Sequence, residues 1–298
     1  MRMLALAAFL AASALPSIAR TVAPKAPSPG DVLAAAPAAD WEAVDDGNVL
    51  LLEFAGGRRV AIQLATLHAP GHVANIHALV REGWFQRHAA IVRVQENYVV
   101  QWGDPTEKAA LPDDVEQSPQ GSYERQNKPV DFRPLPFKDA YGAKVGHARG
   151  WPVATDGKVH WLPHCPGMVG VGRDMPPDTG SGAELYVVIG HGPRHLDRNI
   201  ALVGRVLSGI EGLSALPRGT GALGFYEDPT QRVKLVSARM ALDLREDERP
   251  RFEVLRTGSA SFAKWVDVRA NRRDEFFVRP AGGADICNLM PPVREVKR

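Results

Sequence analysis

An arginine, a tyrosine and a glutamine occur with the spacing R-x4-Y-x2-Q in a stretch that otherwise has the composition of a buried strand. They are Arg93, Tyr98 and Gln101 in RVQENYVVQWGDPT, residues 93–106. The guanidinium of arginine stays protonated and offers several N–H donors, and the amide of glutamine can both donate and accept. Such a set can hold a polar group beside an apolar ring, but it contains no nucleophile.

Two other motifs lack the context that their chemistry requires. GTGALG, residues 219–224, has the G-x-G-x-x-G spacing of a dinucleotide-binding loop, but it follows Pro217 and leads into FYEDPTQ instead of a helix. We therefore interpret it as a loop. Ser181 lies in GSG and lacks the G-x-S-x-G elbow of a nucleophilic serine.

Three histidines, His68, His72 and His77, are spaced so that one helix could carry them. A metal site needs a ligand geometry and supporting hydrogen bonds that this spacing does not supply. We interpret these histidines as surface or partly buried residues and predict no metal and no cofactor.

The elements that must position the first motif are mainly strands. NVLLLEFAGGRRVAIQLA, residues 48–65, has two apolar runs around a Gly-Gly pair, which predicts a hairpin. HAPGHVANIHALVREGWF, residues 68–85, has apolar residues at helical spacing behind its proline. AAIVRVQENYVVQW, residues 89–102, alternates like a strand. A second block, residues 167–244, has four strand-like runs and a short helical stretch near residue 210.

Many strands with one helix near each half predict a mainly β fold, a closed antiparallel β-barrel with two capping helices. Residues 105–163 are rich in proline, glycine and charged residues, and we interpret them as a long, mostly irregular insertion. Residues 245–298 form a C-terminal extension. Phe262, Trp265 and Val266 share a helical face there, so we expect it to be mainly helical and packed on the barrel.

The N-terminal residues have the features of an export signal. Arg2 supplies a positive start, an apolar run follows, and Ser17-Ile18-Ala19 has the small-x-small form of a cleavage site. The run is shorter than the ~20 residues that span a bilayer. We expect residues 1–19 to be a cleaved signal peptide and the Pro/Ala-rich residues 20–40 to be a flexible linker. The mature protein is then periplasmic or secreted, without membrane insertion.

The overall composition is that of a globular protein. The chain has 298 residues, of which 45% are apolar and 23% charged, and its formal charge is +2. A nucleic-acid partner would leave a basic stripe, which is not seen, so we expect no such partner.

The two cysteines, Cys165 and Cys287, allow one bridge, and an exported chain lets it form. We expect this disulfide. The other interpretation is a reactive or metal-binding thiol in HWLPHC, where His160, His164 and Cys165 cluster.

Five segments resemble, in chain order, the cyclophilin-type peptidyl-prolyl cis-trans isomerases. PGHVANIHALVREGWF resembles the family's first helix, and RVQENYVVQWGDPT resembles its signature of an arginine, an aromatic residue and a glutamine before a Gly-Asp turn. PGMVGVGR, GSGAELYVV and HLDRNIALVGRVLSGIEGL resemble the second half. The resemblance covers about residues 48–240 and implies a cyclophilin-like domain over residues 41–244, interrupted by the insertion.

The resemblance also implies roles for single residues. Arg93 matches the arginine that acts on the prolyl amide, and Gln101 matches the glutamine that hydrogen-bonds the substrate backbone. Tyr98 and Val99 match the lining of the proline pocket, and Leu196 matches a pocket leucine. The full set of positions that match the family's substrate-binding residues is Tyr98, Val99, Gln101, Glu184, Tyr186, His195 and Leu196.

Some positions depart from the family's pattern. His195 stands where tryptophan is frequent, which implies weak cyclosporin binding, and Ile200 stands where histidine or tyrosine is frequent. Val92 and Leu185 replace a histidine and a phenylalanine. The resemblance implies an isomerase of X-Pro bonds in exported polypeptides, acting as a monomer and assisting their folding. The alternative is a barrel with little or no catalysis that serves as a protein-binding or chaperone module.

Overall fold

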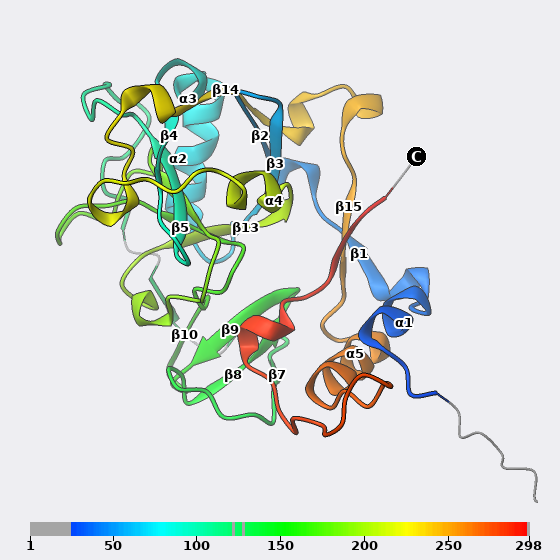
Figure 1. Ribbon diagram of the computed structural model, residues 1–298. Coiled ribbons are helices and arrows are strands. Elements are labelled where there is room, and N and C mark those ends of the chain that lie inside the picture. Colours follow the sequence, from blue (N-terminus) through cyan, green and yellow to red (C-terminus); the bar gives the residue numbers. More distant parts are fainter. Residues whose placement is uncertain (1–24, 121–122, 127–128, 297–298) are drawn as a thin grey trace, which may run out of the picture.

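The computed structural model describes residues 25–120, 123–126 and 129–296 (Figure 1). It has an eight-stranded barrel, a smaller five-stranded sheet and a three-stranded sheet in which a strand at residues 41–43 joins two strands of the C-terminal extension. The expected signal peptide, residues 1–19, lies outside the described residues. Within them, no helix has the length and apolar character needed to cross a membrane.

The barrel confirms the predicted closed antiparallel architecture. Its strands are joined in the order β11-β12-β5-β4-β14-β2-β3-β13, and β13 pairs with β11 to close it. The strands are β2 (Val49–Phe54), β3 (Arg58–Leu64), β4 (Ala90–Val94), β5 (Val99–Gly103), β11 (Met168–Val171), β12 (Leu185–Val188), β13 (Leu202–Ser208) and β14 (Val233–Met240).

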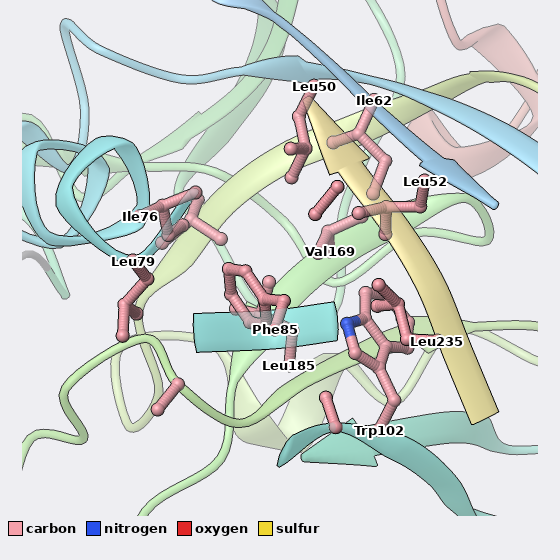
Figure 2. Close-up of a cluster of buried hydrophobic side chains, with 14 of the residues drawn as sticks. Leu50, Leu52, Ile62, Ile76, Leu79, Phe85, Trp102, Val169, Leu185 and Leu235 are labelled. Atoms are coloured by element: carbon pink, nitrogen blue, oxygen red, sulfur yellow. The ribbon is translucent and has the colours of Figure 1, made fainter. Parts of the chain in front are cut away.

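Helices fill the barrel with apolar side chains. The two expected capping helices are α2 (Pro70–Arg81), which has its proline in the first turn, and the short α4 (Ile210–Ser214). A third helix, α3 (Trp84–His88), follows α2 after Gly83, whose positive φ allows the sharp turn. Figure 2 shows Phe85 of α3 among Trp102, Leu185 and Leu235 from three strands of the barrel.

The insertion, expected to be mostly irregular, contains a small sheet that was not anticipated. Five short strands form a sheet in the order β6-β10-β9-β8-β7, and an apolar cluster that includes Trp151 and Trp161 packs beside it. These strands have two to five residues each, too few to show an alternating pattern. Their bounds are β6 (Arg125–Gln126), β7 (Arg133–Pro134), β8 (Lys144–Ala148), β9 (Trp151–Thr155) and β10 (Val159–Trp161).

The C-terminal extension mixes one helix with two strands. The helical expectation is correct for α5 (Ala260–Ala270), which buries Phe262 and Trp265. Two strands, β15 (Phe252–Leu255) and β16 (Val293–Glu295), were not anticipated. They form the three-stranded sheet β1-β15-β16 with β1 (Trp41–Ala43).

The Pro/Ala-rich segment before β1 also differs from the expected flexible linker. Residues 29–34 form helix α1 (Pro29–Ala34), whose start is capped by a reciprocal pair of hydrogen bonds between Ser28 and Asp31. Val32 packs in a cluster with Phe262 and Trp265 of α5. A six-residue helix is too short to be recognised by periodicity, and it is stable because α5 covers its apolar side.

Short 3-10 turns connect several of these elements. They are η1 (Ala38–Asp40), η2 (Asp46–Asn48), η3 (Arg194–Leu196), η4 (Ala222–Gly224), η5 (Pro229–Gln231), η6 (Ala241–Asp243), η7 (Glu246–Glu248) and η8 (Ile286–Leu289).

The predicted disulfide is confirmed. Cys165 and Cys287 are bonded, so neither is a free thiol or a metal ligand. Cys165 lies just after the insertion and Cys287 lies in η8, so the bond fastens the extension beside the entrance to β11.

Candidate functional site

The first motif lies on the outer face of the barrel, on β4 and β5. Side chains alternate along β5: Val100 and Trp102 enter the barrel core, whereas Val99 and Gln101 point the other way. In the neighbouring strand β12, Tyr186 pairs with Gln101, so the side chains of both residues share the outer face. Pairing of β4 with β5 places Arg93 opposite Gln101.

Arg93 is held by three hydrogen bonds. Its Nε donates to the carbonyl oxygen of Leu223 at 2.7 Å, and Nη1 donates to Oε1 of Gln101 at 2.9 Å. Nη2 donates to Oε1 of Gln95. A guanidinium has five N–H groups, so one on each terminal nitrogen has no acceptor among the described residues. These two groups are available to a bound ligand.

Two aromatic rings contact the guanidinium. Its central carbon lies 5.5 Å from the ring centroid of Tyr98 and 5.4 Å from that of Phe225, within the range of cation–π attraction. Burial lowers the pKa of Arg93, but an arginine keeps its charge at neutral pH. The site therefore presents a fixed, partly desolvated cation.

Gln101 links Arg93 to Glu184. Its Nε2 donates to Oε1 of Glu184, which leaves its own oxygen to accept from Arg93. Burial raises the pKa of Glu184 above its ordinary value. The amide of Gln101 is thus oriented from both ends, with one N–H group left for a ligand.

An apolar cluster lies beside this polar row. It consists of Val99, Tyr186 and Val188, with Tyr98 and Ile200 packed against them. Three residues with a predicted role in proline binding, Tyr98, Val99 and Tyr186, are therefore brought together. Ile200, which replaces a histidine or tyrosine of the family's pattern, packs against the same apolar cluster.

Two predicted residues lie in the neighbouring turn η3. The side chain of Leu196 is half-buried, and that of His195 is exposed. Neither residue belongs to the apolar cluster of Val99 and Tyr186. Their predicted contact with a ligand stays a prediction.

Sequence reasoning missed three residues that contact Arg93: Gln95, Leu223 and Phe225. Leu223 and Phe225 belong to the segment 219–225, which contains the GTGALG motif, and this segment is a loop as expected. Gly219 donates its backbone N–H to the carbonyl of Val94, so the loop is attached to β4. The sequence signal for this contact was weak: two apolar residues beside closely spaced glycines.

The histidines do not gather into a metal site. His72 is buried in α2, with its Nε2 3.1 Å from the carbonyl oxygen of Thr179. In the part of the chain that the structure describes, no group of three or more His, Cys, Asp or Glu side chains could hold a metal ion.

Known proteins share this fold and this stretch of sequence. The family model for cyclophilin type peptidyl-prolyl cis-trans isomerase/CLD matches residues 50–240. A probable peptidyl-prolyl cis-trans isomerase of Brucella suis biovar 1 is 26% identical over 193 residues, covering 64% of this chain and 83% of that protein. A protein of the same name from Brucella melitensis biotype 1 gives the same values.

A solved structure extends the likeness beyond the barrel. The crystal structure of cyclophilin AquaCyp293 from Hirschia baltica has a TM-score of 0.68 and 26% identity, and the match covers 89% of this chain and 96% of that one. The stretch matched by the family model runs from the second residue of β2 to the last residue of β14. Because that stretch is more than half of the chain and contains almost the whole barrel, the protein belongs to the cyclophilin-type peptidyl-prolyl cis-trans isomerase family.

Proposed function

We propose that this isomerase acts on X-Pro bonds of exported polypeptides and assists their folding, with Arg93 as its catalytic residue. The observation that carries the assignment of Arg93 is its pair of N–H groups without an acceptor among the described residues, next to the apolar cluster of Val99 and Tyr186. A proline ring is an apolar group attached directly to an amide nitrogen. A site that binds it and acts on that nitrogen therefore needs an apolar cluster beside a hydrogen-bond donor.

The chemistry follows from the electronic structure of the peptide bond. Rotation faces a barrier of ~18 to 20 kcal/mol because the nitrogen lone pair is delocalised into the carbonyl. In the twisted transition state the lone pair returns to the nitrogen and can accept a hydrogen bond. A donor aimed at that position stabilises the transition state more than the planar ground state. Arg93 supplies such a donor, and its fixed orientation avoids reorganisation during the reaction.

The other residues hold the substrate. Tyr98, Val99 and Tyr186 bind the proline ring, with Leu196 at the edge of the pocket, and the remaining N–H of Gln101 binds a backbone carbonyl. Glu184 acts indirectly by orienting Gln101. His195 is exposed and contacts residues of the substrate outside the proline pocket.

The proposed setting is the periplasm or the extracellular space. The sequence of residues 1–19 and the disulfide between Cys165 and Cys287 support it, because disulfides persist in oxidising compartments. Uncatalysed X-Pro isomerisation takes tens to hundreds of seconds and can limit folding, so a monomeric isomerase there would serve proline-containing clients. N-terminal sequencing of the protein from fractionated cells tests this setting: a start at Arg20 supports it, and an intact Met1 in the cytoplasm contradicts it.

The assay for Arg93 compares the wild type with Arg93→Ala on an Ala-Pro tetrapeptide. We expect kcat/KM to fall by about 100- to 1,000-fold, the usual effect of removing a donor to a transition state. The matched control is Arg59→Ala, which removes an exposed arginine of β3 that pairs with Glu53. Equal turnover by Arg93→Ala and the wild type would exclude Arg93 as the catalytic residue.

The alternative is a binding module without significant turnover. The observation in its favour is that Gln101 is already hydrogen-bonded by Arg93 and Glu184, which restricts its contact with a substrate. A titration with the same tetrapeptide separates the two functions. Binding by folded wild type without any turnover would favour the binding module.

A further inference from the structure

A buried polar network lies directly behind the apolar cluster. His164 is fully buried, and its Nδ1 lies 3.1 Å from Oδ1 of Asp197, while its Nε2 lies 2.9 Å from the hydroxyl of Tyr186. A carboxylate only accepts, so Nδ1 carries the proton and Nε2 accepts from the tyrosine hydroxyl. Burial lowers the pKa of His164 and raises that of Tyr186, so both groups stay neutral at neutral pH.

Asp197 connects this pair to further buried groups. Its Oδ2 accepts from Nε1 of Trp161 at 3.1 Å and from Nε of Arg194 at 2.6 Å. Burial alone would raise the pKa of Asp197, but the hydrogen bonds from His164 and the charge of Arg194 outweigh it and hold the pKa below its ordinary value. The two terminal nitrogens of Arg194 also pair with Asp139, at 3.0 and 3.1 Å.

The network joins the insertion to two sides of the proposed proline pocket. Asp139 and Trp161 belong to the insertion, and His164 follows it directly. At the other end, the network holds the ring of Tyr186 through its hydroxyl. It also fixes the turn that carries Leu196, because Arg194 and Asp197 stand on either side of that residue.

Stability alone is a weak explanation for this network. The side chains of Arg194, Asp139 and Asp197 are at most 5% exposed, and removing such charges from water costs several kcal/mol for each ion. Well-packed apolar residues often replace buried ion pairs without loss of stability. A buried network does, however, fix geometry, and the geometry fixed here is that of Tyr186 and Leu196.

We propose that His164 and Asp139 are positioning residues, through which the insertion sets the affinity of the pocket for the proline ring. The proposal rests on the proposed function of Arg93 and its neighbours. Neither residue touches the substrate, and neither is bonded to Arg93. Their loss should therefore raise KM and leave kcat nearly unchanged.

The test uses Tyr186→Phe, which keeps the ring and removes only the hydroxyl. We expect KM for the Ala-Pro tetrapeptide to rise about five- to tenfold, as for the loss of one hydrogen bond, with kcat within about twofold of the wild type. His164→Leu and Asp139→Asn should change KM in the same direction. The double variant Tyr186→Phe with His164→Leu should be no worse than His164→Leu alone, because both changes break the same bond.

A matched control separates positioning from a purely structural role. Tyr226 is also buried, and its hydroxyl donates to the carbonyl of Pro217 at 2.7 Å, so Tyr226→Phe removes a comparable bond outside the network. We expect this control to lose stability without a rise in KM. If Tyr186→Phe also loses stability while its KM is unchanged, the proposal is overturned, even if His164→Leu fails to fold.

The same variants can be tested if the proposed isomerase activity is absent. If the wild type shows no turnover, the dissociation constant of the same tetrapeptide replaces KM as the readout. A five- to tenfold weaker binding by Tyr186→Phe, with Tyr226→Phe unchanged, then supports positioning of a binding pocket. Absence of both turnover and binding in the wild type overturns both proposals.

Discussion

Arg93 is a cation whose position is determined by its neighbours on three sides. Gln101 and Gln95 accept from its terminal nitrogens, and the carbonyl of Leu223 accepts from Nε. Within the described part of the chain, two N–H groups of the guanidinium have no acceptor, one on each terminal nitrogen. A guanidinium restrained in this way loses little conformational freedom when a ligand binds. The restraint therefore favours a hydrogen bond that forms only while the substrate's peptide bond is twisted.

Phe225 should contribute to this restraint through its ring. We expect Phe225→Ala to lower kcat/KM about two- to fivefold, since cation–π contacts at exposed sites are worth roughly 0.5 to 1 kcal/mol. Stability should change little because the side chain is 38% exposed. Phe276→Ala is the control, because that phenylalanine is 83% exposed and contacts Phe277 in the extension. Equal kcat/KM in both variants would show that the ring over Arg93 has no effect.

The loop of residues 219–225 depends on glycine for its approach to β4. Gly224 has φ +79°, and a Cβ placed on it would lie 2.7 Å from the Cα of Gln95. Such a contact cannot be accommodated without displacement of the loop backbone. Gly224 therefore allows a close packing of two backbones next to Leu223, whose carbonyl accepts from Arg93.

Gly224→Ala should reduce both stability and turnover. Its matched control is Gly282→Ala, because Gly282 has a similar φ of +75° but no atom within 4 Å of the added Cβ. In both variants the free energy of unfolding should fall by about 1 kcal/mol, because alanine disfavours the left-handed backbone conformation. Only Gly224→Ala should lose a further 1 to 3 kcal/mol in urea unfolding and about tenfold in kcat. Indistinguishable unfolding free energies would contradict the close packing of the loop.

At the scale of the whole molecule, a disulfide and a buried histidine are among the contacts that hold the extension against the insertion and the residues that follow it. The disulfide links Cys165 to Cys287, and His147 of β8 donates from Nε2 to the carbonyl of Leu289 at 2.7 Å. The ring of His147 also packs edge-on against Phe262 of α5. Its Nδ1 is buried and has no partner within the described ranges.

This histidine should make the protein sensitive to acid. Burial lowers the pKa of His147 to about 4, whereas the unfolded chain binds the proton near pH 6.5. Between these values the unfolded state holds more protons, so stability falls as the pH falls. We expect a loss of roughly 2 kcal/mol from this group between pH 7.5 and pH 5, measured by urea unfolding. His147→Gln keeps a donor for Leu289 and should show a smaller loss; an equal loss would contradict the assignment.

Long elements were predictable from the sequence, and short or distant ones were not. The hairpin of β2 and β3 and helix α2 have six to twelve residues with a clear period. The stretch 89–102 was expected to be strands, and it forms β4 with Arg93 and β5 with Gln101. The strands of the insertion are too short for such a pattern. Contacts such as that of Leu223 with Arg93 join residues 130 positions apart and leave no trace in local spacing.

The three-stranded sheet gives the molecule a mechanical property. Trp41 at the start of β1 pairs with Leu255, whereas Glu295 at the end of β16 pairs with Phe252 at the opposite end of β15. Tension between Trp41 and Glu295 therefore draws the two outer strands in opposite directions along β15. The load falls on all hydrogen bonds of both ladders together, in shear, instead of on one bond after another. The barrel, with Arg93 on its outer face, stays free of this tension until the sheet yields.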